Sequence, residues 1–164
     1  LTLTGNASGV IKSGTAVAST SGTSIDFTGI PSTAKRITVM FNGVSSNGTS
    51  NYLIQIGSGS ITTSGYASAS TYAQSGAAVG GSTSTAGIIL TNGNAANIFS
   101  GQMCLSLISG NTWVASGVFA LESGTVVTFT GGKGSLSNAL DRVRITTVNG
   151  TDTFDAGSIN ILYE

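Results

Sequence analysis

The chain has 164 residues, of which 40% are hydrophobic and only 7% are charged, with a formal net charge of +0. Disordered chains combine low hydrophobicity with high charge, so this composition excludes disorder. Binding to nucleic acid requires clustered Lys and Arg, and the six basic residues are scattered. Every apolar run is far shorter than the about 20 residues of a membrane span. We therefore expect no nucleic-acid partner and no membrane insertion.

Short runs that alternate apolar and polar residues recur along the chain, which is the pattern of half-buried β-strands. In chain order they cover residues 24–28, 36–41, 52–56, 86–90, 103–107, 113–121, 126–130, 143–148 and 159–163. β-Branched and aromatic residues fill them, and no segment shows a helical period. We expect one all-β domain over residues 1–164, an antiparallel β-sandwich or jelly roll of about nine strands with essentially no helix.

Turn residues separate the runs, and the parity within each run predicts the core. Asn-Gly pairs begin at Asn42, Asn47, Asn92 and Asn149 and supply positive φ angles. The side chains expected to be buried are those of Phe27, Ile37, Val39, Phe41, Ile54, Ile56, Met103, Leu105, Leu107, Phe119, Val143, Ile145, Ile159 and Ile161. Trp113 opens a strand with the same inward parity, so core packing is favoured over a role in stacking against a sugar.

Residues 57–85 differ from the rest, because they are almost entirely Gly, Ser, Thr and Ala with two separate tyrosines, Tyr66 and Tyr72. Loops longer than about 12–15 residues are uncommon and usually functional or disordered. We expect one or two long surface loops here, with at most a short strand near Tyr66. Tyrosines on Ser/Gly-rich loops are typical of adaptable binding surfaces, and the alternative for each is a ring folded back onto the sheet.

Catalytic and metal-binding chemistry is poorly represented. The chain has no histidine and one cysteine, which excludes Ser-His-Asp and Cys-His catalysis and the usual zinc sites. Asp152 and Asp155 lie in a Gly-flanked turn and favour backbone capping, with a weak calcium site as the alternative. We expect no enzyme activity and no cofactor.

Several stretches resemble one family. Residues 25–31 (IDFTGIP), 35–45 (KRITVMFNGVS), 111–117 (NTWVASG) and the ending 140–164 are similar to the C-terminal domain of tailed-bacteriophage and prophage tail-fibre proteins. The resemblance covers roughly residues 14–164, although residues 58–85 show no comparable sequence similarity to the family. It implies a homotrimeric β-structured fibre tip, exposed on the extracellular virion and used to attach to a bacterial surface receptor, with no catalytic motif to carry over. Residues 1–14 would then be a linker or the upstream fibre connection.

Three functions remain open. A receptor-binding module predicts aromatic-bearing loops at one end of the sandwich, here residues 57–85 and 92–97. The leading contacts to a surface receptor, expected to be a glycan, are Tyr66, Tyr72, Asn94 and Asn97. A structural virion protein, either a decoration or cementing protein or a fibre trimerisation segment, predicts a flat apolar patch and no free-standing loops. A carbohydrate-active enzyme is disfavoured by the missing histidine and the scattered acids.

Overall fold

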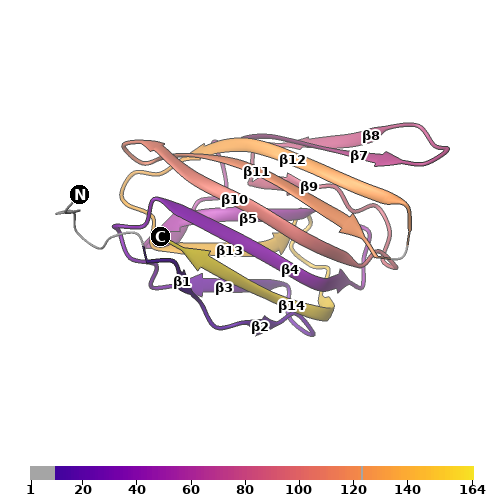
Figure 1. The fold of residues 1–164 in the computed structure, drawn as a ribbon, viewed down its shortest axis with the longest axis horizontal. Helices are drawn as coiled ribbons and strands as arrows, with labels where there is room; N and C mark the ends of the chain where they lie inside the picture. Colours follow the sequence, from indigo (N-terminus) through magenta and orange to yellow (C-terminus); the bar gives the residue numbers. More distant parts are fainter. Residues whose placement is uncertain (1–9, 123) are drawn as a thin grey trace, which may run out of the picture.

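The computed structural model describes residues 10–122 and 124–164, which form two antiparallel β-sheets packed face to face (Figure 1). The larger sheet has the order β1-β14-β4-β10-β11-β12-β7-β8, with β2 beside β14. Its strands are β1 (Lys12–Ser13), β2 (Val17–Ala18), β4 (Arg36–Ser46), β7 (Ala67–Gln74), β8 (Gly80–Ser84), β10 (Phe99–Ser109), β11 (Thr112–Leu121), β12 (Val126–Ser135) and β14 (Phe154–Tyr163).

The smaller sheet has the order β3-β13-β5-β6, with β9 beside β5. Its strands are β3 (Ser24–Thr28), β5 (Tyr52–Ser58), β6 (Ser60–Ile61), β9 (Ile88–Leu90) and β13 (Arg142–Thr147). No described residue is helical, so the prediction of an all-β antiparallel sandwich is confirmed. None of the described residues belongs to a helix that could cross a membrane.

Each of the nine predicted runs overlaps a strand, and the described residues contain five more, β1, β2, β6, β7 and β8. The expectation of long loops over 57–85 was therefore wrong. Strand β7 pairs with β12 on one side and with β8 on the other. The backbone of the segment finds its hydrogen-bond partners in these ladders, so an apolar alternation is not needed to hold it in place. Of the predicted linker, residues 1–9 lie outside the described residues, while Lys12 and Ser13 pair with β14.

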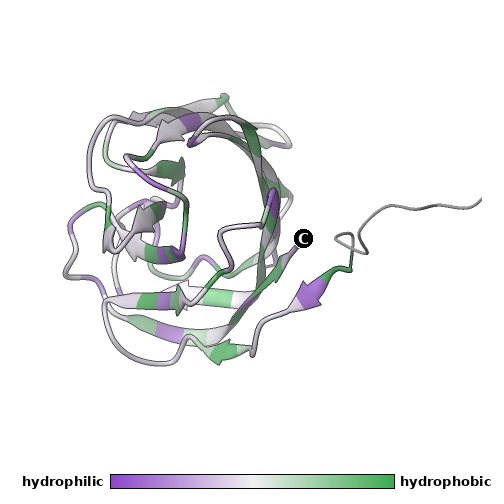
Figure 2. Ribbon diagram, turned by 90° about the vertical axis from the view of Figure 1, so that its left-hand side faces the viewer, coloured by the Kyte–Doolittle hydropathy of each residue, from purple (hydrophilic) through white to green (hydrophobic). Residues whose placement is uncertain are grey.

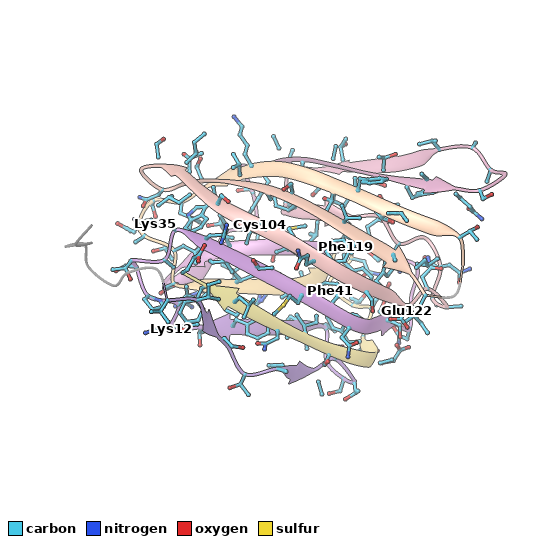
Figure 3. All side chains as sticks on the ribbon, in the orientation of Figure 1. Lys12, Lys35, Phe41, Cys104, Phe119 and Glu122 are labelled. Atoms are coloured by element: carbon cyan, nitrogen blue, oxygen red, sulfur yellow. The ribbon has the colours of Figure 1, made fainter. Side chains whose placement is uncertain are left out.

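The core lies between the sheets and has the predicted composition. Thirteen of the fourteen core side chains expected from the sequence are buried, whereas Leu107 is half-buried against the core cluster. An aromatic group fills one part, with Phe41 and Phe119 in an edge-to-face contact at a 5.1 Å centroid distance (Figure 3). Trp113 is buried as expected.

The larger sheet curves around the smaller one (Figure 2). Strand β1 and the C-terminus lie at one end of the sandwich, where Figure 3 places Lys12 and Lys35. The ends of β7 and β11 and the starts of β8, β10 and β12 lie at the opposite end, near Glu122. The sandwich therefore has a terminal end and a distal end.

Candidate functional site

A pocket of about 650 Å³ is lined by residues at the strand ends that lie at the distal end in Figure 1. A volume in this range is typical of small-molecule sites. Its walls are made by β7, β8, β11, β12, the start of β10, the residue before β5 and the loop of residues 91–97. It is lined by Asn51, Tyr72, Gln74, Gly80, Gly81, Ser82, Thr91, Asn92, Gly93, Asn94, Asn97, Phe99, Leu121, Val126 and Thr128.

Three of the four residues expected to contact a receptor line this one pocket: Tyr72, Asn94 and Asn97. Tyr72 is on β7, whereas the two asparagines are on the 91–97 loop. Sequence analysis selected them separately, from the composition of two segments, and the fold brings them together. Gln74 and Asn92 lie within the two segments, 57–85 and 92–97, that were expected to carry attachment, although neither was singled out, whereas Asn51 was missed. Asn92 also belongs to one of the recognised Asn-Gly turns.

The fourth residue, Tyr66, is not a surface residue, and the expectation that it contacts a receptor was wrong. Its side chain is 3% exposed. Its hydroxyl accepts a hydrogen bond from the Ile56 amide at 2.8 Å and lies 3.0 Å from the Thr62 carbonyl oxygen. The ring packs over Gly134, where an added Cβ would lie 2.7 Å from the ring. Burial raises the pKa of Tyr66 to about 12, which is the behaviour of a structural phenol.

Tyr66 and Tyr72 differ because of their position along one strand face. Side chains two residues apart point to the same side of a strand, so Ser68, Ser70 and Tyr72 share the inward face of β7. Tyr66, which immediately precedes β7, has the same inward parity. Tyr66, Ser68 and Ser70 are buried and Tyr72 is half-buried. Tyr72 therefore stands where the interior of the sandwich opens into the pocket.

The Tyr72 ring is positioned by a glycine on the neighbouring strand. Tyr72 pairs with Gly80, and an added Cβ at Gly80 would lie 2.5 Å from the Tyr72 hydroxyl oxygen and 2.7 Å from Cζ. The ring thus lies across β8 in space that any other residue would occupy.

The 91–97 loop is fixed by hydrogen bonds from its asparagines. The Asn92 side-chain amide donates to the carbonyl oxygens of Gly48 and Ser50, both at 3.3 Å, and its backbone amide donates to Asn51 Oδ1 at 2.8 Å. Asn97 Nδ2 donates to the Asn92 carbonyl oxygen at 3.1 Å. Gly93 has φ +89°, which favours glycine at this turn. These contacts make a pre-formed wall, and pre-organisation lowers the cost of binding.

Among the residues that the structure describes, no charged side chain lines the pocket. None of the six acidic side chains is among the lining residues, and each has a hydrogen-bond or ion-pair partner. Asp26 pairs with Arg144 and Asp141 with Arg142, both at 2.7 Å, and Glu164 pairs with Arg36. The Arg142 guanidinium lowers the pKa of Asp141. Glu122, although close to Leu121 in sequence, accepts a hydrogen bond from Ser100.

Of the two carboxylates in the Asp152–Asp155 turn, Asp152 caps the backbone. Asp152 accepts hydrogen bonds from the Ser50 amide at 3.0 Å and from Asn149 Nδ2 at 2.6 Å. Asp155 instead accepts from the Ser45 hydroxyl. Across the described part of the chain, no group of three or more His, Cys, Asp or Glu side chains could hold a metal ion. The calcium alternative therefore has no support from this geometry.

The outer face of the larger sheet carries a separate feature, which we call the outer patch: Val114, Val118 and Phe129. These side chains are 38%, 49% and 46% exposed. Val118 on β11 is paired directly with Phe129 on β12, so two of the three side chains are cross-strand neighbours. Exposed apolar side chains grouped in this way are typical of protein contact surfaces.

Comparisons of the chain with protein-family models, with curated proteins and with solved structures found no match.

Proposed function

We propose that this domain is the tip of a bacteriophage or prophage tail fibre, exposed on the virion, and that it attaches to a glycan on the bacterial surface through the distal pocket. The observation that carries the proposal is the convergence of Tyr72, Asn94 and Asn97 on one pocket. An aromatic ring offers a flat face for the C–H groups of a sugar, and amides offer donors and acceptors for its hydroxyls. The resemblance of the sequence to tail-fibre domains supports the same function.

The position of the pocket is also favourable for attachment. It lies at the distal end, opposite β1 and the C-terminus (Figure 1). A fibre that continued from the N-terminal side of the domain would hold the pocket outward. Binding groups on a rigid scaffold are commonly found in such projecting positions.

We propose that attachment involves no catalysis. Glycoside hydrolysis uses two carboxyl groups that flank the scissile bond, and no carboxylate lines the pocket. The chain also has no histidine to act as a general base.

The test is adsorption of the fluorescently labelled domain to a panel of bacterial strains, measured by flow cytometry. On a strain that is bound, mild periodate treatment of the cells should abolish adsorption, because periodate cleaves vicinal diols of sugars, whereas protease treatment should leave it unchanged. Loss of adsorption after protease alone would contradict a glycan receptor. Absence of adsorption across a panel that contains a strain sensitive to the parent phage would contradict the attachment function.

The outer patch favours a second candidate, a structural virion protein. Val118 and Phe129 are the kind of exposed apolar pair that an assembled protein covers, and much of 57–85 forms strands instead of the long loops that a receptor-binding module predicts. A homotrimeric fibre tip would also use such a surface. Light scattering of the purified domain separates the states: a trimer mass that falls to a monomer mass in the double variant V118D/F129D would support assembly through this patch. A monomeric parent would contradict it.

A further inference from the structure

The composition of the pocket restricts the ligand, provided that the proposed attachment function holds. The lining has five amide side chains, one tyrosine and a partly apolar base formed by Phe99, Leu121 and Val126, with no Lys, Arg, Asp or Glu. A carboxylate or phosphate would have to leave water without a cationic partner, which is costly. The pocket therefore disfavours acidic sugars and phosphorylated sugars.

Asn94 and Asn97 each have one side-chain atom without a partner among the described residues; the third asparagine of the loop, Asn92, has a buried Oδ1 that also lacks one. Asn94 Oδ1 accepts a hydrogen bond from the Ala96 amide at 3.0 Å, which leaves Asn94 Nδ2 as a spare donor. Asn97 Nδ2 donates to the Asn92 carbonyl oxygen at 3.1 Å, which leaves Asn97 Oδ1 as a spare acceptor. The backbone partners fix both amide orientations, since an amide proton requires an oxygen and a carbonyl oxygen requires an N–H group.

A spare donor together with a spare acceptor fits a hydroxyl group, which both accepts and donates a hydrogen bond. A carboxylate or phosphate can only accept, and would leave Asn97 Oδ1 facing another acceptor. Tyr72, held over Gly80, supplies the only aromatic ring in the lining that is not fully buried. A hexopyranose has both features that this arrangement requires: hydroxyl groups for the asparagines and apolar C–H groups on its ring for Tyr72.

We propose that the distal pocket binds an uncharged hexopyranose unit of the receptor glycan, with a sugar hydroxyl held between Asn94 Nδ2 and Asn97 Oδ1 and the sugar ring against Tyr72. Because charge has no part in this recognition, binding depends only weakly on salt.

The first experiment is a ¹H–¹⁵N NMR titration of the full chain with the methyl α-glycosides of glucose, galactose and mannose, and with methyl α-glucuronide, methyl α-galacturonide and glucose 6-phosphate. At least one neutral glycoside should shift the amide signals of residues 91–97 and of Tyr72 saturably, with a millimolar Kd. The uronide of the same sugar should bind at least tenfold more weakly. Equal or tighter binding of an acidic or phosphorylated sugar overturns the proposal, as does saturable binding that shifts other signals.

The second experiment is the substitution Asn94→Asp, which keeps an oxygen for the Ala96 amide but replaces the spare donor with a carboxylate oxygen. We expect the Kd for the bound neutral glycoside to rise by about tenfold, the usual result of losing one hydrogen bond. Asn138→Asp introduces the same charge at an exposed position outside the pocket and should leave the Kd unchanged. An unchanged Kd for Asn94→Asp would overturn the assignment of this residue.

The outcomes separate this proposal from the attachment function on which it rests. A domain that adsorbs to cells but binds none of the neutral glycosides refutes the neutral-hexose proposal alone. A domain that adsorbs to no strain of the panel refutes the attachment function itself.

Discussion

Strands β13 and β7 lie in different sheets, and their inward side chains differ: those of β13 are mainly apolar and those of β7 carry hydroxyl groups. β13 presents Val143 and Ile145, both fully buried, to the core. β7 presents Ser68 and Ser70 with the same period of two, and these side chains are also buried. A sandwich can therefore be closed by hydroxyl groups where apolar side chains are lacking.

The serines of β7 hold β9 by replacing backbone partners. Ser68 Oγ accepts a hydrogen bond from the Ile89 amide at 3.2 Å, and Ser70 Oγ accepts from the Thr91 amide at 3.1 Å. From β12, Thr130 donates to the Ile89 carbonyl oxygen. Since β9 also pairs with β5 of the smaller sheet, these hydroxyls join the two sheets. The side of the sandwich that these hydroxyls close includes Thr91 and Tyr72, which line the pocket proposed to bind the receptor.

The largest loss of stability is expected from truncating a side chain in the apolar region, that is, the part of the core filled by apolar and aromatic side chains. Phe119→Ala removes a fully buried ring that contacts Phe41 at a 5.1 Å centroid distance. We expect the free energy of unfolding to fall by about 3–5 kcal/mol, the usual cost of such a truncation. Urea unfolding followed by tryptophan fluorescence measures it. A loss below about 1 kcal/mol would show that the apolar region is not the dominant source of stability.

The loss of folding stability at alkaline pH can be compared for two buried tyrosines, one from each region. Burial raises the pKa of Tyr52, in the apolar region, and of Tyr66, beside β7, each to about 12. A phenol in the unfolded chain ionises near about pH 10, so the unfolded state releases its proton first. The stability contributed by each group is complete below about pH 10 and is lost as the pH rises toward 12, at roughly 1.4 kcal/mol per pH unit per tyrosine.

Thermal unfolding from pH 8 to pH 12 tests this expectation. The variants Tyr52→Phe and Tyr66→Phe should each show a shallower decline of stability above about pH 10 than the parent. Identical slopes in the parent and both variants would contradict the buried state of these phenols.

A smaller loss of stability is expected where the serines of β7 hold β9. Ser68→Ala leaves the buried Ile89 amide without its partner, and an unsatisfied buried donor costs about 1–3 kcal/mol. Ser116→Ala, at an exposed position of β11, is the matched control and should change stability by less than about 0.5 kcal/mol. If both variants unfold at the same urea concentration, the hydroxyl contacts do not hold β9.

The smallest expected effect on stability comes from Gly80→Ala, and it contrasts with Gly81→Ala. An added Cβ at Gly81 would lie 2.4 Å from the Ser70 backbone oxygen, whereas at Gly80 it meets only the far end of the Tyr72 side chain. Gly81→Ala should therefore cost about 1–3 kcal/mol. Gly80→Ala should be nearly neutral for stability but should weaken receptor binding by moving the Tyr72 ring. Equal stability losses would contradict this placement of Tyr72.

The apolar region could be predicted from the sequence because alternation of Val, Ile and Phe identifies both a strand and its inward face. Strand β7 could not, because inward Ser68 and Ser70 resemble loop residues until their partners on β9 are known. Tyr66 illustrates the same limit: the space for its ring is provided by Gly134, a residue distant in sequence. Tyr72, Asn94 and Asn97 were identified by composition, but their meeting in one pocket depends on the sheet order.

We propose that the distal pocket, and not the outer patch, binds the receptor. The most direct measurement is the apparent Kd of the labelled domain on a bound bacterial strain, for the parent, Tyr72→Ala and Phe129→Ala, with folding and oligomeric state checked by circular dichroism and light scattering. We predict that Tyr72→Ala weakens adsorption by tenfold or more, in keeping with the roughly 1–3 kcal/mol that an aromatic stacking contact contributes, while Phe129→Ala leaves the Kd of the assembled domain unchanged. Full adsorption of a folded Tyr72→Ala domain, together with loss of adsorption in Phe129→Ala, would contradict the claim.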